Sequence, residues 1–494
     1  MTMLRSARAV LHTLPAAIAL GVLAASAVPG QGALTLTLQD ALALGQRQGL
    51  QAHAAQGSRD AARSRDHLFF TQYLPSLSIG GSSVPAYTRS ITPVIQPDGS
   101  TLYKPLQQTT AGLSAILTQR VPWTNTTLNF SSGLNEVQLS GTAGVRTWSS
   151  TPFQVQISQP LARANSQLWD TRQQELRFTS AERKYLEARE DVSIAVTNAF
   201  FDVHSAALTL RNAASNAATN DTLYTLNKGR LEVGKIGEND LLQSELALLR
   251  ARSALEDGRL GYDKALAQFR ITLNVAPGTP VAITVTNDVP LFDADTIVSV
   301  QQARRNTSPM SDAEGSEVQA NRSVREARWN TGAGGNLSAS YGYNATAANA
   351  PAAYKNLLDA QQLQVSVQIP VWQWGAHSAS VEAAKADRFS AQSNAQTSRS
   401  QTENNAHFAA LQLGQARRSL TIAAKADTVA AKRFEVALNR YGISKITIDN
   451  LFIAQNEKDQ ALSTYVQALR GYWLAYFGLR KATLYDFENG QVIR

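Results

Sequence analysis

Two stretches of the chain share one pattern of apolar and polar residues, and this pattern decides the expected fold. Val155-Gln-Ile-Ser-Gln-Pro160-Leu161 is followed 210 residues later by Val365-Ser-Val-Gln-Ile-Pro370-Val371. In both stretches, and in the residues just before them, apolar side chains alternate with Gln or Ser, which predicts β-strands with one apolar and one polar face. Such strands differ from the continuous apolar runs of a buried parallel sheet. We therefore expect a sheet that meets water on one face only.

The similarity extends into the flanking sequence. The same offset of 210 residues relates Leu241 to Leu451, whereas an offset of 260 residues relates Leu77 to Leu337 ahead of the strands. Two offsets that each hold across an element indicate an internal duplication. Their difference places about fifty extra residues among the strands of the first copy, where 113–117 and 127–131 suggest an additional strand pair.

The duplication predicts a mixed α and β chain built from two similar repeats. The expected segments are a signal peptide over 1–27, a first repeat over 34–270, a waist element over 271–294, a second repeat over 295–485 and a short tail over 486–494. The first repeat is expected to hold a helix over 36–73, strands over about 74–161 and a long helical hairpin over 162–270. The second is expected to hold a helix over 295–329, strands over about 335–371 and a long hairpin over 372–485.

The hairpins are expected to be long rods. No proline interrupts the Ala-rich sequence between Pro160 and Gly229 or between Pro370 and Gly442. At about 1.5 Å per residue, such helices reach on the order of 100 Å, more than a compact domain needs. In the returning helices a large side chain recurs every seven residues, with a small one three positions later, as in Leu241 and Ser244. This heptad predicts close coiled-coil packing.

The composition excludes several classes of protein. The 494 residues carry a formal net charge of +8 and include no Cys. The mean hydropathy of −0.21 excludes a bundle of lipid-spanning helices. The absence of Cys excludes a disulfide-built fold, a thiolate metal site and an acyl anchor on an N-terminal Cys. Because the positive charge is mild and no run of Lys and Arg occurs, we expect no nucleic-acid partner.

The first residues have the pattern of a cleaved secretory signal. Arg5 and Arg8 are basic, an apolar run covers 14–24, and Ala25-Ser26-Ala27 provides small residues for cleavage. The apolar run is too short to span a bilayer. We therefore expect an exported protein.

No motif in the chain points to catalysis. The six His are scattered and form no His-x-x-x-His pair, so no metal site is expected. Residues 229–235 fit the pattern G-x-x-x-x-G-K, but Ile236 stands where a phosphate-binding loop needs a Ser or Thr hydroxyl. The motif also follows a predicted helix, and a nucleotide loop follows a buried strand. We expect no enzyme, no catalytic residue and no cofactor.

The order of these elements resembles the TolC-like outer membrane efflux protein family, the outer membrane factors. The first helix opens with Leu36-Thr-Leu-Gln-Asp40-Ala41-Leu42, as in that family. Val233-Gly234-Lys235-Ile236 with the following Asp240-Leu-Leu242 is similar to the family's turn between helices, and Tyr441-Gly442-Ile443 through Asp449-Asn450-Leu451 is its second copy. The resemblance covers essentially the whole chain after the signal peptide.

The resemblance implies a homotrimer in which strands from three chains close one transmembrane β-barrel, continued by a long antiparallel α-helical coiled-coil barrel. Such a protein is integral to the outer membrane and extends into the periplasm. The absence of Cys further indicates that this chain is not lipid-anchored, unlike some of its relatives. It conducts substrates passively within a tripartite efflux or type I secretion assembly. The implied partners are outer membrane lipid, a periplasmic adaptor (membrane fusion) protein, and an inner-membrane pump of the RND, ABC or MFS type. The strand residues expected to face lipid are Phe153, Val155, Ile157, Val365, Val367 and Ile369.

The resemblance also assigns roles to the two helix turns. The residues implied to contact an adaptor are Val233, Gly234, Lys235, Ile236, Ile443, Ser444, Lys445 and Ile446. The candidates for a cation-selective periplasmic aperture are Glu238, Asp240, Asp449 and Asn450. The second copy departs from the first, because Asn450 occupies the position of Asp240. The alternative role for these acids is to stabilise a helix start.

A second class of function remains open from the sequence. A soluble periplasmic coiled-coil interaction or adaptor protein without a pore would also need long helical hairpins. Such a protein has no use for duplicated amphipathic strands, and these favour the channel.

Overall fold

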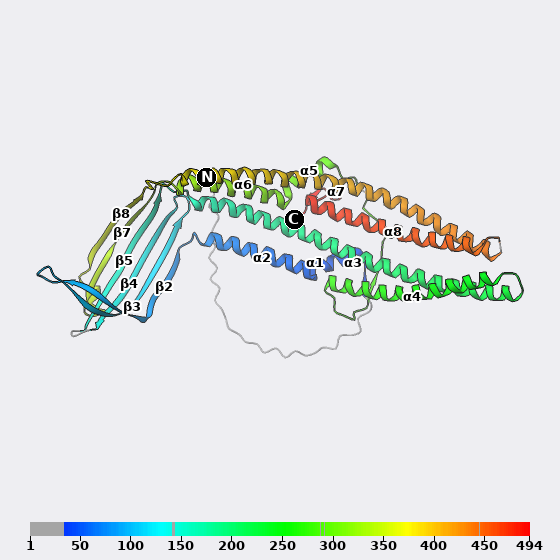
Figure 1. The fold of residues 1–494 in the computed structure, drawn as a ribbon, viewed down its shortest axis with the longest axis horizontal. Helices are drawn as coiled ribbons and strands as arrows, with labels where there is room; N and C mark the ends of the chain where they lie inside the picture. The colour runs from blue at the N-terminus through cyan, green and yellow to red at the C-terminus, as the bar shows by residue number, and fades with distance from the viewer. Residues whose placement is uncertain (1–33, 141–143, 287, 291, 444) are drawn as a thin grey trace.

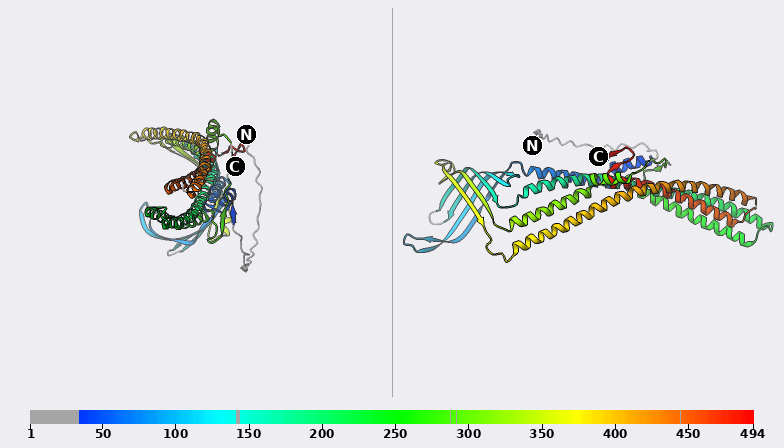
Figure 2. Two further views of the ribbon diagram at one scale, coloured as in Figure 1. Left: turned by 90° about the vertical axis from the view of Figure 1, so that its right-hand side faces the viewer. Right: turned by 90° about the horizontal axis from the view of Figure 1, so that it is seen from above.

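The computed structural model describes residues 34–140, 144–286, 288–290, 292–443 and 445–494. The expected signal peptide over 1–27 lies outside these residues. The chain is elongated, with a sheet at one end and helices running to the other (Figure 1). Seen end-on, it curves like part of a wall (Figure 2).

The sheet has six antiparallel strands in the order β2-β3-β4-β5-β7-β8. Their bounds are β2 (Ser76–Ile95), β3 (Thr101–Val121), β4 (Thr126–Ser140), β5 (Val145–Leu161), β7 (Gly334–Ala347) and β8 (Leu358–Gln368), with the short 3-10 helix η1 (Ala352–Tyr354) between the last two. The segments 113–117 and 127–131 lie in β3 and β4, so the extra residues of the first half form two full strands. Among the described residues, β2 and β8 each pair on one side only.

Two helical hairpins extend from the sheet. α3 (Ser166–Glu232) and α7 (Ala376–Gly442) each have 67 residues, and the returning α4 (Glu238–Leu273) and α8 (Ile448–Thr483) each have 36. At about 1.5 Å per residue, the longer helices reach about 100 Å. The heptad positions of α4 face its partner, because Ser244, Leu248 and Phe269 are buried. The burial of these three positions agrees with the predicted packing face of α4.

The helix expected over 36–73 is in fact two helices, α1 (Leu38–Gln48) and α2 (Leu50–Thr71). Gly49 separates them with an extended backbone, at ψ 141°. The Gly49 N–H still donates to the carbonyl of Gly45 at 3.0 Å. A Cβ at Gly49 would lie only 2.4 Å from the same carbonyl oxygen, so the bend depends on glycine.

The helix expected over 295–329 is also two, α5 (Thr296–Asn306) and α6 (Ser308–Asn330). Pro309 has no N–H to donate to the carbonyl of Arg305, so a continuous helix would leave that carbonyl unpaired. In the structure Arg183 of α3 donates to the Arg305 carbonyl at 2.8 Å and to the Thr307 carbonyl at 3.1 Å. The break is thus stabilised by a side chain from a neighbouring helix.

The core lies at the waist, where α1, α3, α4 and α8 meet. Phe200, Phe269, Leu273 and Tyr472 are fully or almost fully buried there, and each such side chain stabilises the fold by about 1.5–3 kcal/mol. β1 (Leu34–Leu36) pairs in parallel with β6 (Val281–Ile283) beside this core. A small hairpin of β9 (Tyr485–Asp486) and β10 (Gln491–Val492) follows α8.

Candidate functional site

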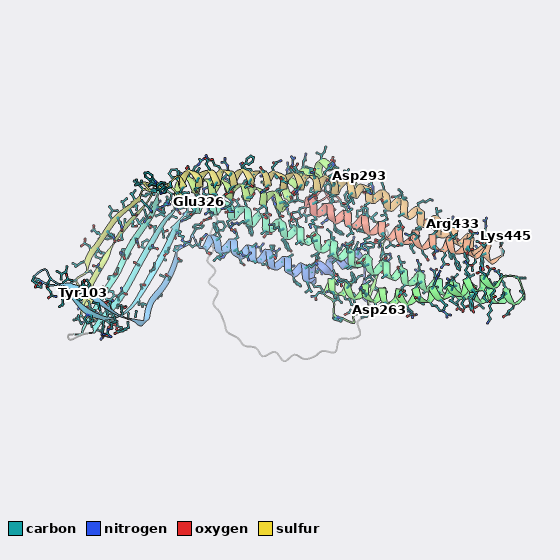
Figure 3. The ribbon with its side chains drawn as sticks, in the orientation of Figure 1. Tyr103, Asp263, Asp293, Glu326, Arg433 and Lys445 are labelled. Carbon is teal, nitrogen blue, oxygen red and sulfur yellow. The ribbon has the colours of Figure 1, made fainter. Side chains whose placement is uncertain are left out.

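Both helix turns lie at the tip, the end of the molecule farthest from the sheet. Lys445 marks this tip, and Tyr103 lies at the opposite end (Figure 3). The two turns are built alike, because the Lys235 N–H donates to the Arg230 carbonyl at 2.8 Å and the Lys445 N–H donates to the Arg440 carbonyl at 2.9 Å. This hydrogen bond across six residues is typical of a helix that ends in a left-handed residue. Gly234 is that residue in the first turn, at φ 67°.

The turns present apolar and basic side chains on the surface. Val233 and Ile443 are 67% and 64% exposed, although both are aliphatic. Lys235 and Lys445 are exposed beside them, as is Gly234, whereas Ile236 and Ile446 are half-buried. Ser444 lies outside the described residues. The structure therefore gathers the described members of the expected adaptor-contact set at one surface.

The four aperture candidates begin the two returning helices. Glu238 and Asp240 lie in the first turn of α4, and Asp449 lies in the first turn of α8. The Asp449 carboxylate accepts a hydrogen bond of 2.6 Å from Gln243 of α4, so it links the two hairpins. Asn450 donates to the hydroxyl of Thr447 at 3.0 Å, within its own helix start. Acids at these positions are also favoured by the helix dipole.

A buried contact between the hairpins was missed by the sequence analysis. The Tyr441 hydroxyl donates to the Asn227 side-chain oxygen at 3.1 Å, and these residues are 6% and 2% exposed. The Arg230 guanidinium lies 5.4 Å from the centre of the Tyr441 ring. Tyr441 also packs with Leu223 and Leu451 in a small apolar cluster. The sequence offered one signal for this contact: Tyr441 directly precedes Gly442, where the second turn begins.

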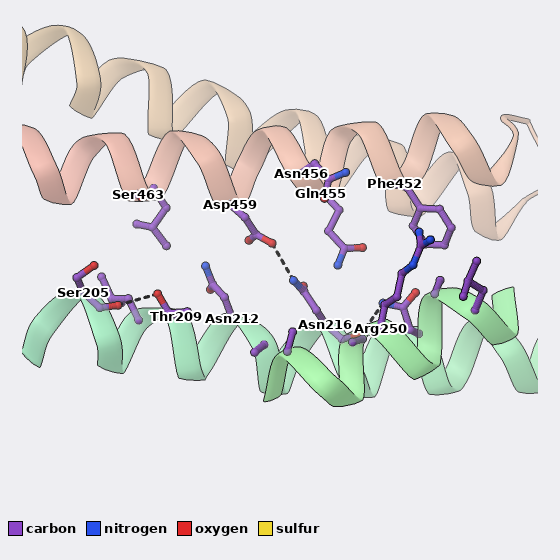
Figure 4. A pocket seen from close by; sticks show the side chains of 18 of the residues that line it. Ser205, Thr209, Asn212, Asn216, Arg250, Phe452, Gln455, Asn456, Asp459 and Ser463 are labelled. Carbon is purple, nitrogen blue, oxygen red and sulfur yellow. Dashed lines mark hydrogen bonds between the residues drawn. The ribbon is translucent and has the colours of Figure 1, made fainter. Parts of the chain in front are cut away.

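A groove between the hairpins lies behind the tip. It has a volume of about 590 Å³ and lies between α3, α4 and α8. Asn216 of α3 donates across it to Asp459 of α8 at 2.7 Å (Figure 4). Asn220 and Gln455 also line it, and each has a buried side-chain oxygen without a hydrogen-bond partner in the described part of the chain. Since buried acceptors normally have partners, the groove is suited to hydrogen-bond donors.

The sheet has a largely polar face and a largely apolar face. Paired residues lie side by side on one face, and one row of pairs contains only polar residues: Ser76, Thr118, Asn129, Gln156, Ser340 and Gln362. The adjacent row on the other face contains Leu77, Leu117, Phe130, Val155, Tyr341 and Gln361.

Five of the six expected lipid-facing residues share the second face. Phe153, Val155 and Ile157 pair with Tyr343, Tyr341 and Ala339 of β7. On the other side of β7, Val365 and Val367 pair with Leu337 and Gly335, which belong to the same alternating set. Ile369 follows one residue after the end of β8.

None of the helices resolved in the structure combines the length and apolarity needed to cross a membrane. Over the same residues, no group of three or more His, Cys, Asp or Glu side chains is placed to hold a metal ion. The segment 229–235, which fits the G-x-x-x-x-G-K pattern, begins inside α3 and ends in the turn that follows it.

The chain combines an amphipathic antiparallel sheet with long helical hairpins, and solved structures share this fold. The fold is similar to the outer membrane channel CmeC of Campylobacter jejuni, with a TM-score of 0.65, 16% identity, and coverage of 92% of this chain and 86% of that chain. It is also similar to VceC of Vibrio cholerae, with a TM-score of 0.63, 11% identity, and coverage of 92% and 97%. For the open state of MtrE of Neisseria gonorrhoeae the TM-score is 0.59, at 14% identity and coverage of 90% and 88%.

The family comparison agrees with the fold. The outer membrane efflux protein family model matches residues 106–275. No curated protein sequence matches the chain. The resemblance to the outer membrane efflux proteins is confirmed, by the family model over residues 106–275 and by the similarity of the fold to solved outer membrane channels.

Proposed function

We propose that three copies of this chain form a duct that passively conducts substrates through the outer membrane and across the periplasm. The observation that carries the proposal is the continuity of the wall: β5 leads into α3, and β8 leads into α7. A lumen lined by the polar face of the sheet would continue directly between the helices. No catalytic step is needed, because the duct only provides a path.

The free edges of the sheet support closure by further copies. β2 runs away from the helices and β8 runs back toward them, so β8 of one copy can pair in antiparallel fashion with β2 of the next. An unpaired edge inside a bilayer leaves backbone groups without hydrogen bonds, which is why membrane sheets close into barrels. In such a barrel the face of Phe153, Val155 and Val365 would contact lipid.

The surface of α7 supports the same assembly. Phe408, Ile422, Val429 and Val436 are 63%, 71%, 55% and 51% exposed, at a spacing that is a multiple of seven residues. A heptad stripe of exposed apolar side chains is typical of a helix that packs against another helix. We propose that a neighbouring copy covers it.

Tryptophans support the position of the membrane boundary. Trp123, Trp372 and Trp374 are 73%, 72% and 89% exposed, and all three lie where the sheet meets the helices. Trp372 and Trp374 contact each other, with ring centres 5.1 Å apart. Exposed Trp at the end of a membrane-spanning sheet is typical of the interface between lipid and water.

We propose that the chain arose from two repeats, 34–270 and 295–485, joined by the waist element 271–294 and followed by the tail 486–494. The equal lengths of α3 and α7, and of α4 and α8, support this division. The two helix turns of the tip share the same hydrogen bond, as expected of duplicated elements.

We propose that the tip receives cargo from a periplasmic adaptor protein and an inner-membrane pump of the RND, ABC or MFS type. The exposed Val233, Lys235, Ile443 and Lys445 would contact the adaptor, because they combine apolar area with charge at the rim. Glu238, Asp240 and Asp449 would form acidic rings at the aperture when three copies meet, and Asn450 would add polar groups.

Membrane fractionation and channel recording test this function. Epitope-tagged protein should appear in the outer membrane fraction, and the purified protein should conduct ions across a planar bilayer. Recovery as a soluble periplasmic protein without conductance would contradict the duct. That outcome would instead favour the coiled-coil interaction protein.

A further inference from the structure

We propose that each chain contributes six strands to the barrel, so that three copies close a barrel of eighteen strands. This inference rests on the proposed function, since it needs a trimer in a membrane. It concerns the two strands β3 and β4, which could enlarge the wall or form a hairpin outside it. Three observations place them in the wall.

The first observation is strand order. β3 pairs with β2 along its length, and β4 pairs with β5, so the hairpin separates β2 from β5. A hairpin outside the wall would instead leave β2 beside β5. The pairing of β3 with β4 is continuous from Val121 and Thr126 to Gln107 and Ser140.

The second observation is the alternation of side chains. Leu117 of β3 and Phe130 of β4 lie in the apolar row between Leu77 and Val155. Thr118 and Asn129 lie in the polar row, where the Thr118 hydroxyl donates to the Asn129 side chain at 2.9 Å. A shift of one residue would turn these side chains to the opposite faces. The hairpin therefore has the same two faces as the rest of the sheet.

The third observation is the anchoring of the turn between β3 and β4. Asn165, which caps the start of α3, donates to the carbonyls of Pro122 and Trp123 at 2.9 and 3.1 Å. Gln159 of β5 donates to the Thr124 carbonyl at 2.9 Å. These contacts fix the turn at the edge where the sheet meets the helices.

A further contact fixes the last residues of β3 at the same edge. Gln119 of β3 donates to the Tyr73 carbonyl at 2.7 Å, in the connection from α2 to β2. The hairpin is thus held on both sides, at α2 and at α3. A hairpin lying on the outside of a barrel would not make hydrogen bonds to both of these segments.

The added strands have no helices of their own. α2 leads into β2, α3 follows β5, α6 leads into β7, and α7 follows β8, while β3 and β4 are joined by the short turn 122–125. The diameter of a barrel grows about linearly with strand number. Eighteen strands therefore give a barrel about 1.5 times as wide as the twelve that three copies would supply without this hairpin.

The width has a consequence for the cargo. Barrels of about 16–18 strands leave a water-filled channel, and the polar row lining this one contains Ser, Thr, Asn and Gln. An exit of this width would not select small solutes by size. Selection would then occur at the tip, and the barrel would pass any solute that the tip admits.

Disulfide cross-linking tests the strand order, and the absence of native Cys removes background reactions. Gly80→Cys with Ser114→Cys links β2 to β3, and Ser131→Cys with Gln154→Cys links β4 to β5, because each pair is directly opposite in the sheet. Both pairs should oxidise in isolated outer membranes. Ser131→Cys with Ser158→Cys is the control and should not, since Ser158 pairs with Thr127 instead.

Polymer exclusion tests the width. Polyethylene glycols of graded size are added on the barrel side of a planar bilayer, and the largest that lowers single-channel current is recorded. Deletion of residues 101–145 joins β2 to β5 through the existing turn and should reduce the cut-off radius by about a third. If the deletion variant does not assemble, the cross-links on the full chain still decide the strand order.

The outcomes separate the two proposals. A membrane trimer that lacks both cross-links, or whose polymer cut-off is unchanged by the deletion, overturns the eighteen-strand barrel alone. A protein that forms no membrane trimer contradicts the proposed function itself. Cross-links in both pairs together with a reduced cut-off support both.

Discussion

An ion pair between Glu190 and Arg480 explains how a charged carboxylate is accommodated in the buried core. The carboxylate of Glu190 is almost fully buried and lies 3.2 Å from the guanidinium of Arg480, which also binds Asp486 at 2.7 Å. Burial raises the pKa of Glu190, and the positive charge of Arg480 acts in the opposite direction. The positive charge of Arg480 therefore compensates the cost of burying the Glu190 carboxylate.

Replacement of Arg480 by Met should destabilise the protein by about 3–5 kcal/mol at neutral pH, because Glu190 is left buried without a partner. The pKa of Glu190 would rise further, so its neutral form would be reached at a higher pH. A carboxyl whose folded pKa is raised favours the folded state at low pH and loses that contribution as pH rises. The deficit in melting temperature should therefore be smaller at pH 5 than at pH 7.5.

The control is Lys481→Met, which removes an exposed pair with Asp191. It should change stability by at most about 1 kcal/mol at either pH. A deficit in the Arg480 variant that does not depend on pH would show that Glu190 is not its cause.

Tyr441 should couple the two hairpins at the tip. Tyr441→Phe removes one hydrogen bond and leaves the buried oxygen of Asn227 without its donor, which costs about 1–3 kcal/mol. Amide hydrogen exchange should become faster in residues 223–230 and 441–451. Tyr224→Phe is the control, because Tyr224 is half-buried on α3, the helix that carries Asn227. Equal protection in wild type and Tyr441→Phe would mean that the contact does not hold the tip together.

The acids of the tip should set ion preference. Three copies would bring three carboxylates of each kind together, and such rings favour cations. The combined variant Glu238→Gln, Asp240→Asn and Asp449→Asn should lower the cation preference measured from reversal potentials in a salt gradient. Unchanged selectivity would remove these residues from the aperture and leave them the role of stabilising helix starts.

At the scale of elements, the sequence was informative where one local signal dominates. The absence of proline and a steady heptad predicted long helical hairpins, and alternation predicted the strands. The helix breaks were missed for a physical reason. A glycine within a helical pattern is often tolerated, so Gly49 alone did not predict a break. The bend there depends on the close approach of the Gly49 backbone to α1 and α4. Pro309 was a usable signal for the second break, but Arg183, which completes it, comes from a distant part of the chain.

Two glycine substitutions test the first break. Gly49→Ala places a Cβ 2.4 Å from the Gly45 carbonyl and 3.3 Å from that of Thr272, so α1 or α4 must shift. We expect a loss of about 1–3 kcal/mol in the free energy of unfolding. Gly57→Ala in α2 meets no atom within 4 Å and should stabilise the protein by about 0.5–1 kcal/mol. A stabilising Gly49→Ala would show that the break does not depend on the close approach.

At the scale of the whole molecule, the duplicated turns allowed the tip to be predicted, because each turn is a local motif. The groove behind it was not, since it depends on the distance between hairpins far apart in sequence. Asn212, Asn216 and Asn220 recur every four residues on α3, and this polar stripe was the available hint. The strand number needed the pairing itself, because composition cannot distinguish a strand in the wall from one outside it.

The central claim is that β8 of one copy pairs with β2 of the next. Ser366→Cys on β8 is combined in turn with Ser76→Cys, Ser78→Cys or Gly80→Cys on β2, all of them exposed at the edges of the sheet. After oxidation of isolated outer membranes, at least one combination should give covalent dimers and trimers on a non-reducing gel, whereas each single variant should remain monomeric. Monomers alone in all three combinations would contradict a barrel closed by neighbouring copies.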